Sequence, residues 1–182
     1  MMKNSCAKTY DTTLFMKQIA VRNYKSDFGG SLLAGRRKSQ RPLSTRNAIH
    51  LVIRSTQSGV FAPGNRSLER LLSEQANRFS ISIYRFAANW SHIHIVLKIK
   101  SREDYTKFIR SLTSVLSQAI RKSSPGRDCV FELRPFTRIL KWGRDFKNAM
   151  DYQILNQLEA RGLIKRVKNR AYASKSVATS VV

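Results

Sequence analysis

Two strand-like segments joined by a very short link place the strongest constraint on the fold of this chain. Apolar and polar residues alternate at about residues 81–87 and again over residues 93–99, as in strands that bury one face. The link, Asn89-Trp90-Ser91, is compatible with a hairpin. In the first strand the alternation predicts two opposite faces, one with Ile81, Ile83 and Arg85 and the other with Ser82, Tyr84 and Phe86.

Three helical segments accompany this hairpin. The first is expected to be capped by Ser67, and the second to begin near Ser101, which with Asp104 forms a capping-box-like start. The third is predicted from about residue 144 to residue 160, with Gly162 just beyond its end.

Two further strands, predicted over residues 48–54 and at about residues 136–140, complete the pattern. The order is then strand, helix, strand, strand, helix, strand, with one extra helix at the end. This order predicts an α+β protein with a ferredoxin-like (split βαβ) antiparallel sheet and helices on one or both of its faces.

The charge of the chain points to its partner. There are 34 Lys and Arg residues against 11 Asp and Glu residues, which gives a formal net charge of +23. Self-repulsion of this size is relieved by a polyanion, so nucleic acid is the expected partner. Residues 1–46 hold 10 basic and 2 acidic residues, and the remaining excess is spread over residues 47–182.

We divide the chain into a basic N-terminal arm (residues 1–46), a folded domain (residues 47–164) and a flexible basic tail (residues 165–182). Residues 29–46 contain glycines and a proline and show neither helical nor strand periodicity. An extended arm and a solvated leader without structure are both compatible with this composition. The stretch holds five basic residues, Arg36, Arg37, Lys38, Arg41 and Arg46.

Several classes of protein are excluded by composition. No run of roughly 18 apolar residues exists, and the first twenty residues lack the apolar segment of a secretory signal. Cys6 and Cys129 are isolated, so they fit neither a disulfide framework nor a zinc site. We expect a protein without membrane spans that keeps free thiols in a reducing cytoplasm.

The three histidines of the chain include the unit His92-Ile93-His94. Residues two apart in a strand point to the same face, so both imidazoles are expected side by side while Ile93 faces the core. Two neutral imidazoles can share a divalent cation but need another ligand. A half-exposed histidine pair that contacts phosphate or solvent is the alternative, and the role of His50 is left open.

The last helix carries an unusual polar pair. Tyr152 lies about 200° around the helix from its apolar neighbours, and Asn156 is one turn further on the same face. The pair therefore lies on a face that the core is not expected to require. A tyrosine half-packed on the sheet beside a surface asparagine is the alternative. The expected apolar stripe is Phe146, Met150, Ile154 and Leu158.

The His-Ile-His strand and the tyrosine helix together resemble the single-tyrosine transposases of the HUH superfamily, most nearly those associated with repetitive extragenic palindromes (REP). The resemblance covers roughly residues 47–164, and Tyr152 is the one tyrosine of six with an amide side chain four residues later. The family's Asn-Pro-x-x-Ala-Gly-Leu ending is matched loosely, since Gln157 replaces the proline.

The resemblance implies an activity. Tyr152 would be the nucleophile, and His92, His94 and Asn156 would bind Mg²⁺ or Mn²⁺. The reaction would cleave and rejoin single-stranded DNA near hairpins through a 5′-phosphotyrosine, in a bacterial, nucleoid-associated protein whose monomeric or homodimeric state is left open. The basic residues of the arm would contact the DNA hairpin, and these are Arg36, Arg37, Lys38, Arg41 and Arg46.

Two alternative functions are considered for a chain with these residues. A ferredoxin-like module that binds RNA or DNA without cutting it, such as a domesticated transposase, has the same residue types. A two-histidine phosphodiesterase or a histidine-triad hydrolase is disfavoured, because Val96 stands where a third alternating histidine would be and His50 is followed by Leu51-Val52.

Overall fold

The computed structural model describes residues 27–33, 39–56, 59–123, 130–131 and 133–165. The elements in chain order are β1 (Asp27–Phe28), the short 3-10 helix η1 (Gly30–Leu33), β2 (Ala48–Arg54), α2 (Arg66–Arg78), β3 (Ser82–Asn89), β4 (His92–Lys98), α3 (Arg102–Ser123), β5 (Phe136–Leu140) and α4 (Arg144–Ala160). No helix in these ranges is long and apolar enough to cross a membrane.

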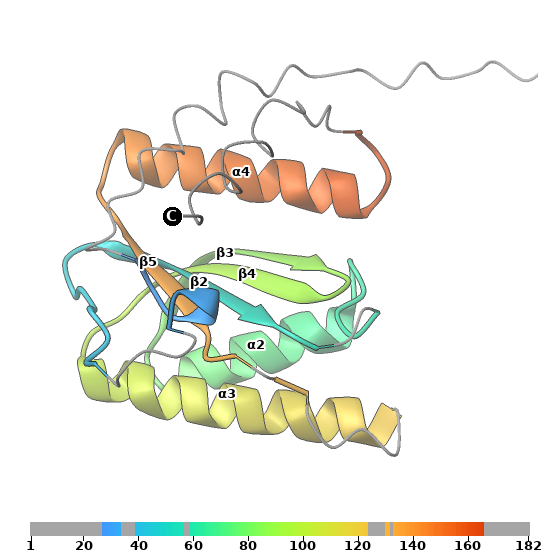
Figure 1. Cartoon of the computed structure of the whole chain (residues 1–182), viewed down its shortest axis with the longest axis horizontal. Helices are drawn as coiled ribbons and strands as arrows, with labels where there is room; N and C mark the ends of the chain where they lie inside the picture. Colours follow the sequence, from blue (N-terminus) through green and yellow to red (C-terminus); the bar gives the residue numbers. More distant parts are fainter. Residues whose placement is uncertain (1–26, 34–38, 57–58, 124–129, 132, 166–182) are drawn as a thin grey trace, which may run out of the picture.

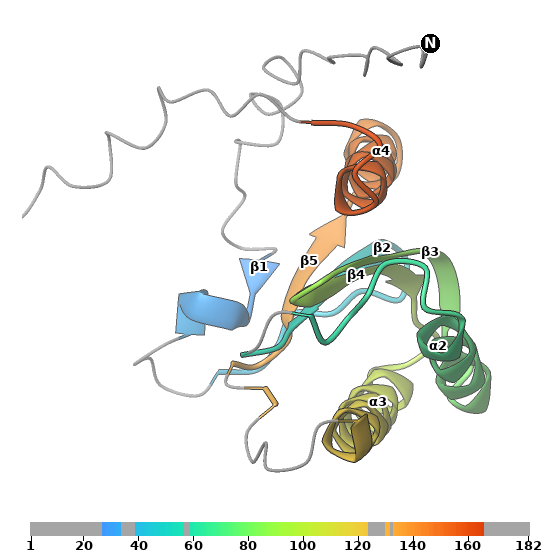
Figure 2. The ribbon, with the colours of Figure 1, turned by 90° about the vertical axis from the view of Figure 1, so that its right-hand side faces the viewer.

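The strands form one antiparallel sheet in the order β1-β5-β2-β4-β3. Helices α2 and α3 cover one face of the sheet, and α4 lies alone over the other face (Figure 1; Figure 2). Without β1, the order β5-β2-β4-β3 is that of the split βαβ fold. The predicted α+β, ferredoxin-like architecture is therefore confirmed, with helices on both faces.

The main core lies between the sheet and the pair α2 and α3. Strand β4 supplies Ile93, Ile95 and Leu97, which are fully buried because alternate residues of a strand point to the same face. The α4 side holds a much smaller apolar cluster around Ala48, Val96 and Leu140. The two faces of the sheet therefore differ, and polar side chains occupy much of the α4 side.

The predicted alternation in β3 fails after Ile83, where the strand contains a bulge. Ile83 pairs with Leu97, but Arg85 pairs with Val96, so one extra residue is inserted between them. As a result Phe86 packs with Ile83 on the main core, and Arg85 lies on the α4 side.

The predicted start agrees with the structure for α3 and differs from it for α2. Ser101 accepts a hydrogen bond from the backbone N–H of Asp104 (3.0 Å), which confirms the predicted start of α3. The predicted cap of α2 is wrong, because the side chain of Asn65 accepts from the backbone N–H groups of Ser67 and Leu68. Asn65 lies at the N-cap position, whereas Ser67 is already inside the helix.

Strand β1 and η1 lie inside the segment predicted as an arm, and no strand was predicted there. Phe28 pairs with Thr137 of β5, and Arg41 donates a hydrogen bond to the Thr137 hydroxyl (2.7 Å). The Arg41 guanidinium also lies over the Phe28 ring, 4.7 Å from its centroid. These long-range contacts hold part of residues 1–46 on the sheet. The rest of that segment, and the tail from residue 166, lie outside the described residues.

Gly29 is required where β1 turns into η1. Its φ is +93°, and an added Cβ would collide with the backbone of Pro135. We predict that Gly29→Ala lowers the melting temperature by several degrees more than Gly59→Ala. Gly59 also has a positive φ (+83°) but open space around it, so its substitution carries only the backbone penalty of about 1–2 kcal/mol. Thermal unfolding followed by circular dichroism measures both, and equal losses would contradict the predicted collision.

Candidate active site

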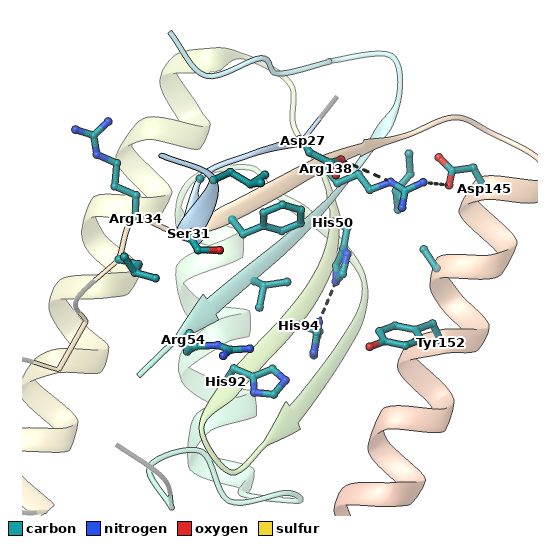
Figure 3. Close-up of a pocket in the computed structure, with 18 of the residues that line it drawn as sticks. Asp27, Ser31, His50, Arg54, His92, His94, Arg134, Arg138, Asp145 and Tyr152 are labelled. Carbon is teal, nitrogen blue, oxygen red and sulfur yellow. Dashed lines mark hydrogen bonds and ion pairs between the residues drawn. The ribbon is translucent and has the colours of Figure 1, made fainter. Parts of the chain in front are cut away.

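A cavity of about 520 Å³ lies on the α4 side of the sheet. β1 and η1 border it on one side and α4 on the other, while β2, β4 and β5 form its floor (Figure 3). Its titratable lining residues come from five elements and one loop and are Asp27, His50, Arg54, His92, His94, Arg134, Arg138, Asp145 and Tyr152.

All three histidines of the chain meet on this floor. His92 and His94 lie on the same face of β4, as predicted, with ring centroids 4.8 Å apart. His50 comes from the neighbouring strand β2, and its Nε2 is 3.0 Å from His94 Nδ1. One of these two nitrogens donates and the other accepts, so the contact fixes the orientation of the His94 ring. The role of His50, left open by the sequence, is thus to support His94.

Burial lowers the pKa of two of these imidazoles, His50 and His92. It lowers the pKa of His50 to about 4, with a smaller contribution from the Arg138 charge. Burial also lowers the pKa of His92, and the nearby Arg54 acts in the same direction. At neutral pH both rings are therefore unprotonated, which is the form that binds metal ions.

Tyr152 faces the histidines from α4. Its ring meets the His94 ring edge to face, with centroids 6.2 Å apart, and it lines the same cavity (Figure 3). The structure therefore brings together three of the four residues for which the resemblance implies chemical roles: His92, His94 and Tyr152.

Asn156, the fourth, was predicted on a face that the core does not require, and this part of the prediction is wrong. It is only 3% exposed, and it is not among the residues that line the cavity. The fully buried positions of α4 are Gln153 and Asn156, whereas Ile154 and Leu158 of the predicted stripe are only partly buried. The reason is that α4 packs on the polar side of the sheet, so its contact face holds amide side chains.

A chain of ion pairs connects the walls of the cavity. Arg138 of β5 binds Asp145 of α4 (2.8 Å) and lies 3.9 Å from Asp27 of β1. Asp145 also accepts a hydrogen bond from the backbone N–H of Lys141 (3.1 Å). These residues are not among the predicted site residues, and neither is Arg54, which pairs across the sheet with His92. For Arg54 the signal was available, since it alternates with His50 and Val52 along β2.

The predicted nucleic-acid contacts are only partly described. Arg36, Arg37 and Lys38 lie outside the described residues. Arg41 is half-buried by its contacts with Phe28 and Thr137, and Arg46 is exposed, with its carbonyl oxygen bound to the Trp142 indole N–H (2.8 Å).

Comparisons with known proteins agree with this site. The model of the family "Transposase IS200 like" matches residues 44–133. A REP-associated tyrosine transposase, solved bound to a REP hairpin, is similar with a TM-score of 0.57 and 12% identity over 70% of this chain and 76% of that chain. A proposed transposase from Deinococcus radiodurans R1 has a TM-score of 0.40 and 11% identity over 66% of this chain and 97% of that chain. No curated protein matches the chain in sequence.

The fold is that of a REP-associated tyrosine transposase. The segment that matches the model of the IS200-like transposase family includes all three histidines. The resemblance expected from the His-Ile-His strand is confirmed, and the match supports a transposase function. The matched segment ends before α4, so Tyr152 and Asn156 lie beyond it.

The ion pair between Arg138 of β5 and Asp145 is predicted to hold the first turn of α4 on the sheet. Asp145→Ala removes both a partly buried ion pair and the acceptor for Lys141 N–H, at an expected cost of about 1–2 kcal/mol. The matched control is Glu74→Ala, which breaks the exposed Arg70–Glu74 pair and is expected to cost less than about 0.5 kcal/mol. Denaturant unfolding of both variants tests this, and equal losses would show that the pair does not hold α4.

Proposed function

We propose that this chain is a single-tyrosine transposase that cleaves and rejoins single-stranded DNA near hairpins. The observation that carries the proposal is the edge-to-face contact between Tyr152 and His94 inside the cavity that His92 also lines. A phenol facing two imidazoles in a cavity that arginine side chains also line suits attack on a phosphodiester. The match of residues 44–133 to the IS200-like transposase family supports this proposal.

In the proposed reaction the Tyr152 phenol oxygen attacks phosphorus and the bond from phosphorus to the 3′ oxygen breaks. The phenol proton passes to solvent, and the departing 3′ oxygen takes up a proton to give a free 3′-OH. The phosphate stays on the 5′ carbon as a 5′-phosphotyrosine. One phosphodiester replaces another, so the step is reversible and needs no ATP.

The residues present fit a divalent cation in part. His92 and His94 offer two imidazoles from one face of β4. No group of three or more His, Cys, Asp and Glu residues that could hold a metal occurs in the described ranges, so a third ligand would be of another type, and the Asn156 amide oxygen is the proposed one. Mg²⁺ or Mn²⁺ bound by these residues would act as a Lewis acid on the scissile phosphate.

The DNA partner is proposed from charge and from a structural neighbour. Arg54 and Arg134 line the cavity, and they would contact the strand's phosphates. The neighbouring REP-associated transposase was solved with a REP hairpin, and we propose the same class of ligand here. Arg36, Arg37, Lys38, Arg41 and Arg46 remain proposed hairpin contacts, and the bacterial nucleoid is the proposed place of action.

The covalent intermediate is the decisive test. Wild-type protein incubated with Mn²⁺ and labelled single-stranded hairpin DNA is expected to give an SDS-resistant adduct, which Tyr152→Phe abolishes. Tyr105→Phe is the matched control, because Tyr105 is buried on the opposite side of the sheet and its adduct yield is expected to match the wild type. An adduct that persists in Tyr152→Phe would show that Tyr152 is not the nucleophile. DNA binding without any adduct would identify a non-catalytic binder instead.

The histidine pair is tested separately from DNA binding. His92→Ala is expected to lower the Mn²⁺-dependent adduct rate by about 100-fold or more while hairpin binding in EDTA stays within about twofold. The reason is that the ring is proposed to act on the cation and not on the DNA. A parallel loss of binding and cleavage would show that His92 contacts the phosphate or supports the fold.

A further inference from the structure

Three aromatic side chains form an exposed cluster at the end of the sheet opposite the histidines. Trp142 in the loop before α4 and Tyr84 of the β3 bulge are 47% and 42% exposed. With the half-buried Phe146 of α4 they make three mutual contacts, with ring centroids 4.9, 5.4 and 5.9 Å apart. We call Tyr84, Trp142 and Phe146 the aromatic platform.

The geometry of the platform is held in place although its surface is open. The Trp142 indole N–H donates to the carbonyl oxygen of Arg46 (2.8 Å), which fixes the ring plane. Phe146 is anchored below by the small cluster of Ala48, Val96 and Leu140. The β3 bulge places Tyr84 against both rings. An exposed aromatic surface with fixed rings is prepared to stack on a flat ligand.

Positive charge surrounds the platform. Lys98 Nζ lies 5.9 Å from the centroid of the Trp142 ring. Lys141 and Arg144 are exposed and flank Trp142 in the chain, and Arg46 is exposed at the residue that holds the indole. Stacking surfaces rimmed by lysine and arginine are typical of proteins that bind single-stranded nucleic acid, because each nucleotide offers a base and a phosphate together.

The platform lies within reach of a strand bound in the cavity. Phe146 and Tyr152 are six residues apart on α4, a separation of about 9 Å along the helix axis. Asp145, next to Phe146, already lines the cavity. A single strand that leaves Tyr152 along α4 therefore reaches the platform within a few nucleotides.

We propose that the aromatic platform binds an unpaired base of the DNA that flanks the cleavage position, by stacking on Trp142 and Tyr84. Lys98, Lys141 and Arg144 contact the adjoining phosphates. This inference rests on the proposed function, because it takes single-stranded DNA as the partner. It adds a binding site outside the cavity, which selects for unpaired flanks and does not take part in bond breaking.

Tryptophan fluorescence reports directly on this site, because the chain has only two tryptophans. In a Trp90→Phe, Tyr152→Phe variant Trp142 is the sole tryptophan and cleavage is prevented. Titration with a hairpin carrying unpaired flanks is expected to quench its emission, while a blunt hairpin of the same stem leaves it nearly unchanged. Equal quenching by both ligands, or none by either, would overturn the proposal. Quenching that depends on protein concentration without DNA would overturn it too, since the platform would then bind a second copy of the chain.

Affinity measurements supply the second test. In the Tyr152→Phe background, Trp142→Ala is expected to weaken binding of the flanked hairpin about 5- to 100-fold, and Trp142→Phe much less. Leu163→Ala is the matched control, because Leu163 is also a large exposed apolar residue, and it should change nothing. Unchanged affinity in a folded Trp142→Ala variant would refute stacking.

The two proposals fail in different ways. If the platform does not bind bases, the wild-type protein still forms the covalent adduct. The Trp142→Ala variant then forms the adduct at the same substrate concentration as the wild type. If Tyr152 is not the nucleophile, no Tyr152-dependent adduct forms, but quenching by unpaired flanks persists.

Discussion

The antiparallel pairing of β4 with β2 is the constraint on which the rest of the structure depends. Its register sets Ile93 opposite Ile53 on one face, and His94 opposite Val52 on the other. A slip of one residue would turn the histidines into the core and the isoleucines out of it. The free energy of burying the apolar face, about 25 cal/mol for each Å² of apolar surface, therefore also fixes the position of the chemical groups.

Helix α4 depends on a different balance of forces. The apolar residues that it packs on the small cluster of Ala48, Val96 and Leu140 are Phe146, Ala149 and Met150, in its first half. The Arg138–Asp145 ion pair and the aromatic contacts of Phe146 lie at that same end. Beyond it the helix buries the amides Gln153 and Asn156. The helix is thus held firmly at its first turns, and Tyr152 is carried on the part that follows them.

Most of the fold could be predicted from the sequence, because the strands and helices show the local periodicity of their apolar residues. The strands at residues 48–54 and 136–140 and the helix at 144–160 have the bounds that were predicted. What failed depends on distant residues. The bulge in β3 follows from packing on β4, and β1 is a two-residue strand that exists only through Arg138 and Thr137 of β5. The prediction for Asn156 is wrong because it takes the apolar stripe of α4 as the buried face of the helix, whereas Gln153 and Asn156 are its buried positions.

In the candidate site, too, residues with a local sequence signal could be predicted and residues that depend on distant contacts could not. His92 and His94 share a motif, and Tyr152 was found by its spacing to an amide. His50 shares the alternation of Arg54 along β2, but its contact with His94 depends on the pairing of β2 with β4. Arg138 carries no local signal, because its partners come from elements that meet only in the folded sheet.

The bulge in β3 affects whether the sheet can pair with other molecules through its edge. In the described part of the chain, β3 and β1 are the two outer strands of the sheet. One is irregular and the other is only two residues long, and neither offers a long, straight row of backbone groups to another molecule. With its large positive charge, the chain is thereby protected against edge-to-edge growth into fibrous aggregates, so high concentrations are expected to remain clear.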